Sequence, residues 1–158
     1  MEKIPLVYIE RGKIAEGRKR FNAVEKLREL KKEYKEVYVI DMDGIKKNKS
    51  NLDVYKKVSQ KPFLWIDSLP RYLEDVMDLI IVGAKRITVG DIIDDDGLSK
   101  IRDMCDGEIF LRGKDEKDVA KKAKKFGFEG IVAVSPKEKV DVPEWGIYLE
   151  EGVVKKVR

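Results

Sequence analysis

The sequence predicts an α/β fold in which about six parallel strand–helix units form a TIM-barrel-like repeat, followed by a C-terminal β-hairpin. Two observations support it. Six short apolar runs rich in Val and Ile recur along the chain, and stretches of helical periodicity separate them. Such runs are typical of strands buried on both faces of a parallel sheet. The predicted strands are 5–9, 37–40, 62–66, 87–89, 109–111 and 131–134.

Apolar stripes at helical spacing predict the helices between these strands. Asn22 stands before the first stripe and Asp115 before the last, where a side-chain oxygen can cap the first helical turn. Gly83 and Gly127 follow two of the stripes, as expected for a left-handed residue that ends a helix. The stripes are Val24, Leu27, Leu30 and Tyr34; Leu69, Leu73, Val76 and Ile80; and Val119, Ala123 and Phe126.

The sequence allows more than one way to close this sheet. A complete barrel usually needs eight strands and about 250 residues, so a length of 158 residues favours the alternative, an open, doubly wound parallel sheet. In a six-strand barrel, the first and sixth strands could pair directly, a hairpin of 146–149 with 153–157 could fill the gap, or a second copy could cover the edges. We expect the hairpin, because it carries apolar residues: Trp145, Ile147, Leu149, Val153 and Val154.

Composition limits the class of protein. The chain is 42% hydrophobic and 41% charged, which predicts a single folded domain over 1–158. Abundant charge with few amide side chains is typical of a thermophile. The net charge of +4 is modest and the basic residues are spread along the helices, so no nucleic-acid partner is expected. The chain has no histidine, which argues against zinc and triad chemistry.

The location expected from the sequence is the cytoplasm. No apolar run approaches the length of a membrane span, and a strand begins where the apolar part of a signal peptide would lie. Cys105 is the only cysteine, so no internal disulfide can form. These features predict a cytoplasmic protein without a membrane partner.

Three long segments match the pattern of a known barrel family in order and spacing. They are "IPLVYIERGKIAEG" (4–17), "VYVIDMDGIKKNKSNLDVYKKV" (37–58) and "FLWIDSLPRYLEDVMDLIIVGAKRITVGDI" (63–92). They resemble the first four strands, the Asp-x-Asp-Gly turn, and the second and third helices of the ribonucleotide isomerase of histidine biosynthesis. The resemblance covers 4–92 well and 108–135 by pattern only. It implies a closed βα-barrel and an intramolecular aldose–ketose isomerase.

Departures from this family predict that its reaction is lost. The family has catalytic carboxylates at the ends of its first and fifth strands, where this chain has Tyr8 and Arg112. Neither side chain replaces a carboxylate near neutral pH. The glycine run that binds a phosphate in the family is Asp67-Ser68-Leu69 here, and the family's seventh and eighth strands, which hold a second phosphate, have no counterpart. We expect a divergent, truncated relative, and the sequence leaves open whether it catalyses another reaction.

The remaining candidates lie at the carboxyl ends of the predicted strands, where α/β folds carry their sites. They are Tyr8, Asp41, Asp43, Asp67, Asp91, Arg112 and Ser135. Clustered carboxylates from neighbouring strands suit magnesium, which makes Asp43, Asp67 and Asp91 the candidate metal ligands. The alternatives are an ion pair with Arg112, or aspartates that only cap helices and make turns.

Two function classes fit these features. One is a small-molecule or divalent-cation binder, with or without catalysis, at the carboxyl face of the strands. The other is a non-catalytic scaffold or partner subunit that acts through protein–protein assembly, including assembly into a homo-oligomer.

Overall fold

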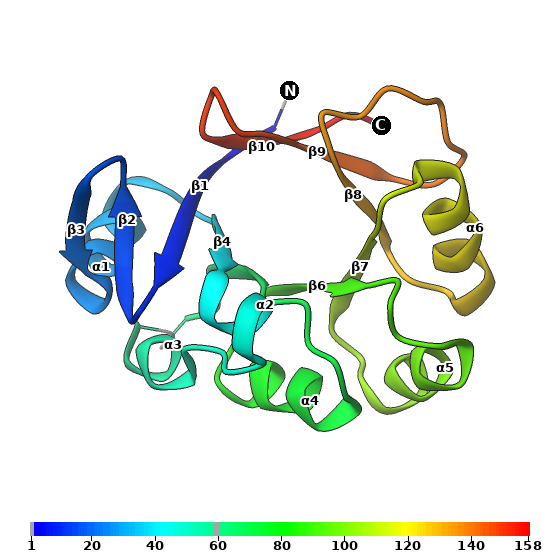
Figure 1. The fold of residues 1–158 in the computed structure, drawn as a ribbon, viewed down its shortest axis with the longest axis horizontal. Helices are drawn as coiled ribbons and strands as arrows, with labels where there is room; N and C mark the ends of the chain where they lie inside the picture. The colour runs from blue at the N-terminus through cyan, green and yellow to red at the C-terminus, as the bar shows by residue number, and fades with distance from the viewer. Residues whose placement is uncertain (1, 59–60) are drawn as a thin grey trace.

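A closed barrel of eight strands forms the centre of the molecule (Figure 1). The structure is a computed structural model and describes residues 2–58 and 61–158. Seven strands run parallel to one another, and the last is antiparallel to both of its neighbours. Their order around the barrel is β1 (Lys3–Glu10), β4 (Val37–Asp41), β5 (Leu64–Asp67), β6 (Arg86–Gly90), β7 (Glu108–Arg112), β8 (Gly130–Val134), β9 (Glu144–Tyr148) and β10 (Val153–Lys156).

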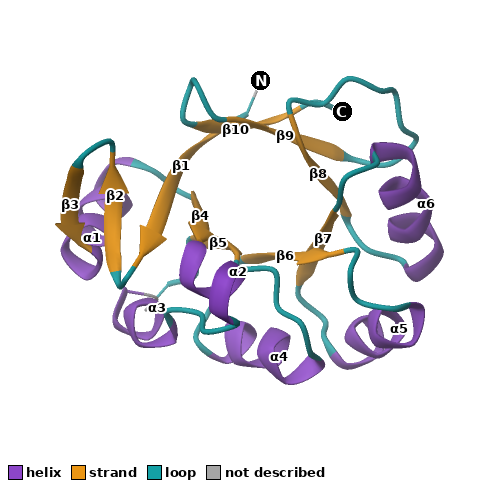
Figure 2. Cartoon of the chain, viewed as in Figure 1, coloured by secondary structure: helices purple, strands orange, loops and turns teal. Residues whose placement is uncertain are grey.

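All six predicted strands are present, each within about two residues of its expected bounds. Helices lie along the outside of the barrel wall over part of its circumference, and in the described chain none lies outside β9 and β10 (Figure 2). They are α1 (Ala23–Glu33), α2 (Met42–Lys47), α3 (Leu52–Val58), α4 (Leu73–Ile81), α5 (Asp95–Met104) and α6 (Glu116–Phe126). The repeat is incomplete at its end, because an irregular segment, 135–143, follows β8 where a sixth unit would have its helix.

The predicted caps define the ends of two helices. The Asn22 side chain accepts a hydrogen bond from Glu25 N at the start of α1, and Asp115 accepts from Lys117 N and Asp118 N at the start of α6. Gly127 ends α6 with a φ of +74°, a conformation that costs a residue with a Cβ. Local sequence therefore fixes the helix boundaries that place the loops at the barrel mouth.

The C-terminal hairpin closes the barrel, as the sequence predicts. β9 pairs in parallel with β8, and β10 pairs with β9 and with the first half of β1 through Ile4 and Val154. The open-sheet alternative is therefore wrong, because the first and last strands of the sheet are hydrogen-bonded to each other. Within residues 2–58 and 61–158, no helix is long and apolar enough to cross a bilayer.

A second hairpin was not predicted from the sequence. β2 (Lys13–Glu16) and β3 (Lys19–Asn22) extend the sheet outward from the end of β1. The β1–β2 turn has positive φ at Arg11 and Gly12, which is the conformation of a type I′ turn. The outer strand is short and carries charged side chains, features that discourage pairing of an exposed edge with another chain.

Side chains fill the barrel interior. Trp65 is central, with ring centroids of Tyr38, Phe110 and Trp145 within 4.6–5.2 Å of its own. The Arg86 guanidinium lies at the amino end of β6, 5.2 Å from the Trp65 and Trp145 ring centroids. A packed interior of this kind is a core and not a channel, so the carboxyl end of the barrel is the end available to a ligand.

Candidate binding site at the barrel mouth

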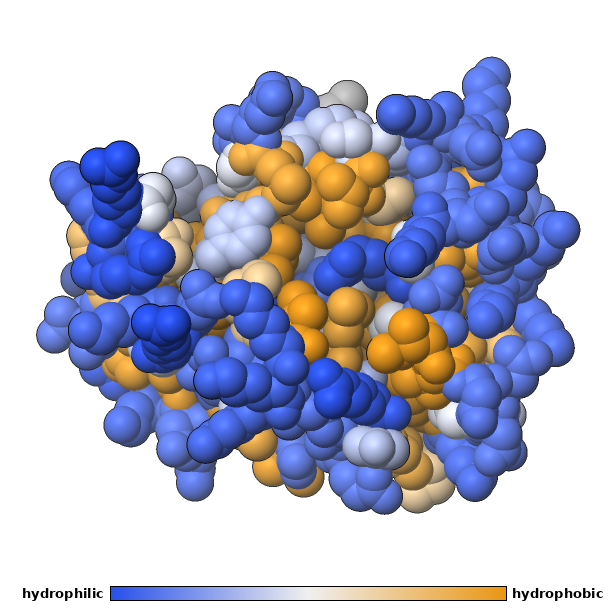
Figure 3. Space-filling view, viewed as in Figure 1, coloured by the Kyte–Doolittle hydropathy of each residue, from blue (hydrophilic) through white to orange (hydrophobic). Residues whose placement is uncertain are grey.

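The carboxyl ends of β1 and β4–β8 open on one side of the molecule, which we call the mouth. In the space-filling view, apolar side chains gather over its centre within a charged surround (Figure 3). Predicted site residues stand on or just after these strands, but they do not form one cluster. The aspartates divide into three separate environments.

Asp67 and Arg112 form the ion pair that the sequence offered as an alternative to a metal site. Arg112 Nε donates to Asp67 Oδ2 at 2.9 Å, and Arg112 Nη2 donates to Asp67 Oδ1 at 3.0 Å. This two-point contact fixes the plane of the guanidinium. Asp67 is fully buried, whereas the Arg112 side chain is 22% exposed. The pair therefore joins the barrel core to the mouth.

A chain of buried hydrogen bonds supports Asp67 from below. Tyr38 donates its hydroxyl to Asp67 Oδ2 at 2.6 Å and lies 3.0 Å from the Thr88 hydroxyl, which accepts from Trp65 Nε1 at 2.9 Å. Burial, followed by the charge of Asp67, raises the pKa of Tyr38 well above its usual value, so the phenol stays a donor. Burial disfavours the Arg112 charge, but the attraction of Asp67 outweighs that effect and raises the pKa of Arg112.

Asp41 holds together the segments that follow β4. Its carboxylate caps α2 through Gly44 N at 3.0 Å and also accepts from Asn51 N at 2.8 Å and from the Tyr55 hydroxyl. Burial raises the pKa of Asp41 even though these bonds favour the ionised form. The Asp-x-Asp-Gly segment is thus the start of a helix and not the turn expected from sequence.

Asp43 anchors the β1–β2 turn. It accepts from Arg11 N at 3.0 Å, from Gly12 N at 3.3 Å and from Asn51 Nδ2 at 2.9 Å. Burial works against its charge, but the hydrogen bonds from Asn51, Arg11 and Gly12 prevail and lower the pKa of Asp43. Its role in the structure is to hold the unpredicted hairpin in place.

The three proposed metal ligands do not share a cavity. Asp67 accepts hydrogen bonds from Arg112 and Tyr38, and Asp43 accepts one from the β1–β2 turn. Asp91 lines a pocket over β6 and β7. Among the residues that the structure describes, no group of three His, Cys, Asp or Glu side chains is placed to hold a metal ion. This geometry gives the magnesium prediction no support.

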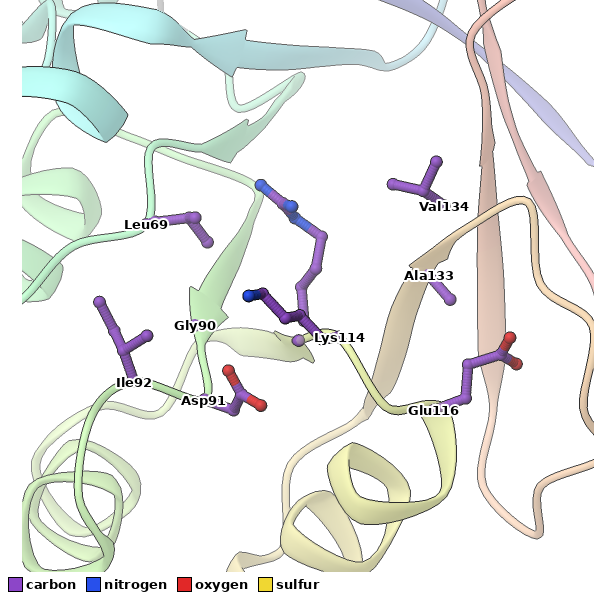
Figure 4. A pocket seen from close by; sticks show the side chains of 10 residues that line it. Leu69, Gly90, Asp91, Ile92, Lys114, Glu116, Ala133 and Val134 are labelled. Carbon is purple, nitrogen blue, oxygen red and sulfur yellow. The ribbon is translucent and has the colours of Figure 1, made fainter.

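The mouth pocket is a hollow of ≈ 410 Å³ over the ends of β6, β7 and β8 (Figure 4). Its size falls within the range of small-molecule sites, about 300–1,000 Å³. Its walls combine apolar and charged side chains from the segments that follow β5, β6 and β7 and from the ends of β6, β7 and β8. They are Leu69, Gly90, Asp91, Ile92, Arg112, Gly113, Lys114, Glu116, Ala133 and Val134.

Several polar groups of this pocket are free to meet a ligand. For the described part of the chain, the structure gives no hydrogen bond or ion pair to the side chains of Lys114 and Asp91, or to Arg112 Nη1. Glu116 is engaged, because its carboxylate accepts from Lys137 N at 2.8 Å and Glu138 N at 3.3 Å. Leu69 adopts φ +45°, a conformation that is strained for a residue with a Cβ and that tends to occur at functional sites.

Tyr8 and Ser135 lie outside the mouth pocket. Tyr8 is half-buried at the end of β1, packs against the barrel core, and has its pKa raised by burial. Ser135 is exposed after β8, and its backbone N–H donates to Ile147 O at 3.0 Å. Ile92, Lys114 and Glu116 were not predicted as site residues, although each follows a predicted strand by a few residues and could have been found as a loop residue of the same face.

No family model matches the chain, and no curated protein matches it.

Proposed function

We propose that the protein binds a small organic anion in the mouth pocket. The observation that carries this proposal is the fixed guanidinium of Arg112. Asp67 holds two of its nitrogens at 2.9 and 3.0 Å, Arg112 lines the pocket, and within the described residues Nη1 has no hydrogen-bond or ion-pair partner. A donor held in place by a buried partner loses little freedom when a ligand binds.

The other walls favour an anion with an apolar body. Lys114 adds a second positive charge, and Leu69, Ala133 and Val134 offer apolar surface. Ile92 is 72% exposed and Val134 is 50% exposed, so a ligand would remove apolar area from water. A carboxylate on an aliphatic chain combines these features.

The resemblance to the ribonucleotide isomerase family is part of this proposal, with the family reaction lost. Tyr8 and Arg112 stand where that family has its acid and base, and Arg112 is committed to Asp67. A catalytic acid or base typically raises the rate by about a hundredfold to ten-thousandfold, so the loss of both should lower the rate by a factor on the order of 10⁴ or more. Purified protein should therefore not turn over the ribonucleotide at an enzymatic rate, and such turnover would overturn this part of the proposal.

Binding is tested by titrating ¹⁵N-labelled protein with 4-methylpentanoate, a branched aliphatic acid. The backbone amides of Gly90, Gly113 and Ala133 should shift with saturation. Lys114→Met should weaken binding by about tenfold, the effect of losing one hydrogen bond to a charged group. Lys121→Met is the control, because Lys121 is also exposed but lies on α6 outside the pocket. The proposal fails if these amides do not respond, or if both variants bind as the wild type does.

A second candidate function is assembly with another protein chain. Ile81, at the end of α4, is 77% exposed, and Met104, at the end of the neighbouring α5, is 61% exposed. Exposed apolar side chains on adjacent helices favour a contact surface. Light scattering at two protein concentrations tests self-association, which Ile81→Lys should abolish.

A further inference from the structure

The mouth pocket contains a carboxylate that a simple organic anion would not need. Asp91 is half-buried at the end of β6, where its N–H donates to Arg112 O at 3.0 Å. This bond fixes the backbone of Asp91 to the neighbouring strand. Within the described chain, its carboxylate has no hydrogen-bond or ion-pair partner.

The position of this carboxylate depends on the absence of a side chain at Gly113. A Cβ at that position would overlap the Asp91 carboxyl group and would lie 2.7 Å from Val119 Cγ2. The Asp91 carboxylate therefore rests against the backbone that joins Arg112 to Lys114. Figure 4 shows Asp91 and Lys114 around the same hollow.

The wall of one pocket thus carries the Asp91 carboxylate, the Lys114 ammonium and the Arg112 guanidinium, whose charge is already paired with Asp67. An anion that binds Arg112 Nη1 and Lys114 would be repelled by Asp91, because like charges in a partly dry site cost free energy. A ligand that also carries an ammonium group turns the same contact into an attraction. Glu116 does not provide this contact, because backbone N–H groups already occupy its oxygens.

We propose that the ligand of the mouth pocket is a zwitterion of the α-amino acid type with an aliphatic side chain. Its carboxylate binds Arg112 Nη1 and Lys114, its ammonium binds Asp91, and its side chain covers Ile92 and Val134. The inference rests on the proposed binding function and specifies the ligand class.

The test compares three probes that differ by one charged group. Leucine carries both groups, 4-methylpentanoate lacks the ammonium, and 3-methylbutylamine lacks the carboxylate. Wild-type protein should bind leucine at least about tenfold more tightly than either analogue, the usual effect of one charge-assisted hydrogen bond. Dissociation constants come from the same amide titrations.

Asp91→Asn should remove the preference for leucine over 4-methylpentanoate. Asp96→Asn is the matched control, because Asp96 is a highly exposed aspartate on α5 outside the pocket, and it should keep the preference. Amide spectra of both variants establish that they are folded. If leucine and 4-methylpentanoate bind the wild type equally, or if Asp91→Asn keeps the preference, the zwitterion is refuted and anion binding stands. If no probe binds, both proposals fall.

Discussion

Replacing Arg112 with methionine should destabilise the protein at neutral pH by stranding a buried charge. Asp67 is 0% exposed, and its two contacts with Arg112 would be lost while the Tyr38 hydroxyl remains as a donor. Removing one partner of a buried pair typically costs about 3–5 kcal/mol. Because the Arg112 side chain is 22% exposed and water can partly replace it, we expect the lower end, about 3 kcal/mol.

The assay is urea unfolding at pH 7, in which the free energy of unfolding of each variant is compared with that of the wild type. The double variant Asp67→Asn/Arg112→Met should be more stable at pH 7 than Arg112→Met alone, because no charge is stranded.

A surface pair gives the control for this prediction. Lys124 and Asp141 are bonded at 2.7 Å, but both side chains are more than 65% exposed. Lys124→Met should change the free energy of unfolding far less than Arg112→Met does, because water and salt screen an exposed ion pair. A loss in Arg112→Met that equals this control, or one that the added Asp67→Asn substitution does not relieve, would refute the view that the mouth pair is a buried charge pair.

Three further predictions concern closure, packing and pH. Deleting 141–158 removes both strands of the closing hairpin, so the truncated protein should aggregate or oligomerise, as measured by size-exclusion chromatography. A truncated monomer with unchanged heat stability would contradict the role of the hairpin in closing the barrel. Gly44→Ala should cost about 1–3 kcal/mol in urea unfolding, because its Cβ would lie 2.5 Å from Ser68 Cβ, whereas Gly107→Ala, with nothing within 4 Å, should be near neutral. Burial, followed by a neighbouring carboxyl group, raises the pKa of Glu144 from 4.5 to about 7, so wild-type stability should fall as pH rises from 4.5 to 7. In Glu144→Gln the melting temperature should change less with pH over this range. A slope equal to that of the wild type would exclude Glu144 as the cause.

The strands and the closure could be predicted from sequence because both depend on short apolar runs. Most residues of the predicted strands are buried in the barrel wall, and the hairpin was expected because an uncovered edge between the first and sixth strands is unfavourable. The opposite charges at the strand ends allowed an ion pair between Arg112 and one of the aspartates as an alternative to a metal site, and the structure forms it with Asp67. Predicting these features needs only the sequence of a single strand, or the fact that the ends of parallel strands lie at the same edge of a sheet.

What could not be predicted depends on contacts between distant segments. The β1–β2 turn has no Asn-Gly or Asp-Gly signal, and Asp43, more than 30 residues away, supplies acceptors for its N–H groups. Gly44 indicated a turn, but it lies inside α2, where Ser68 from another loop leaves no room for a side chain. Asp91 and Arg112 of the mouth pocket were candidate residues, but Lys114 and Ile92 were missed because they belong to loops, whose side-chain directions a periodic pattern does not report.

The way in which the barrel closes also limits what the mouth can do. β9 and β10 join through a short turn at Gly152, and β8 leads into an irregular segment, so this side of the rim lacks the long strand-to-helix loops that enclose sites in complete barrels. The mouth pocket is therefore bounded by the loops after β5, β6 and β7 and by the end of β8. With Ile92 and Val134 left half or more exposed, water reaches any ligand there. General acid–base catalysis needs a group that exchanges protons near neutral pH, and the Arg112 guanidinium in this pocket stays protonated. An open pocket with a permanently charged anchor is suited to reversible binding of a small charged molecule.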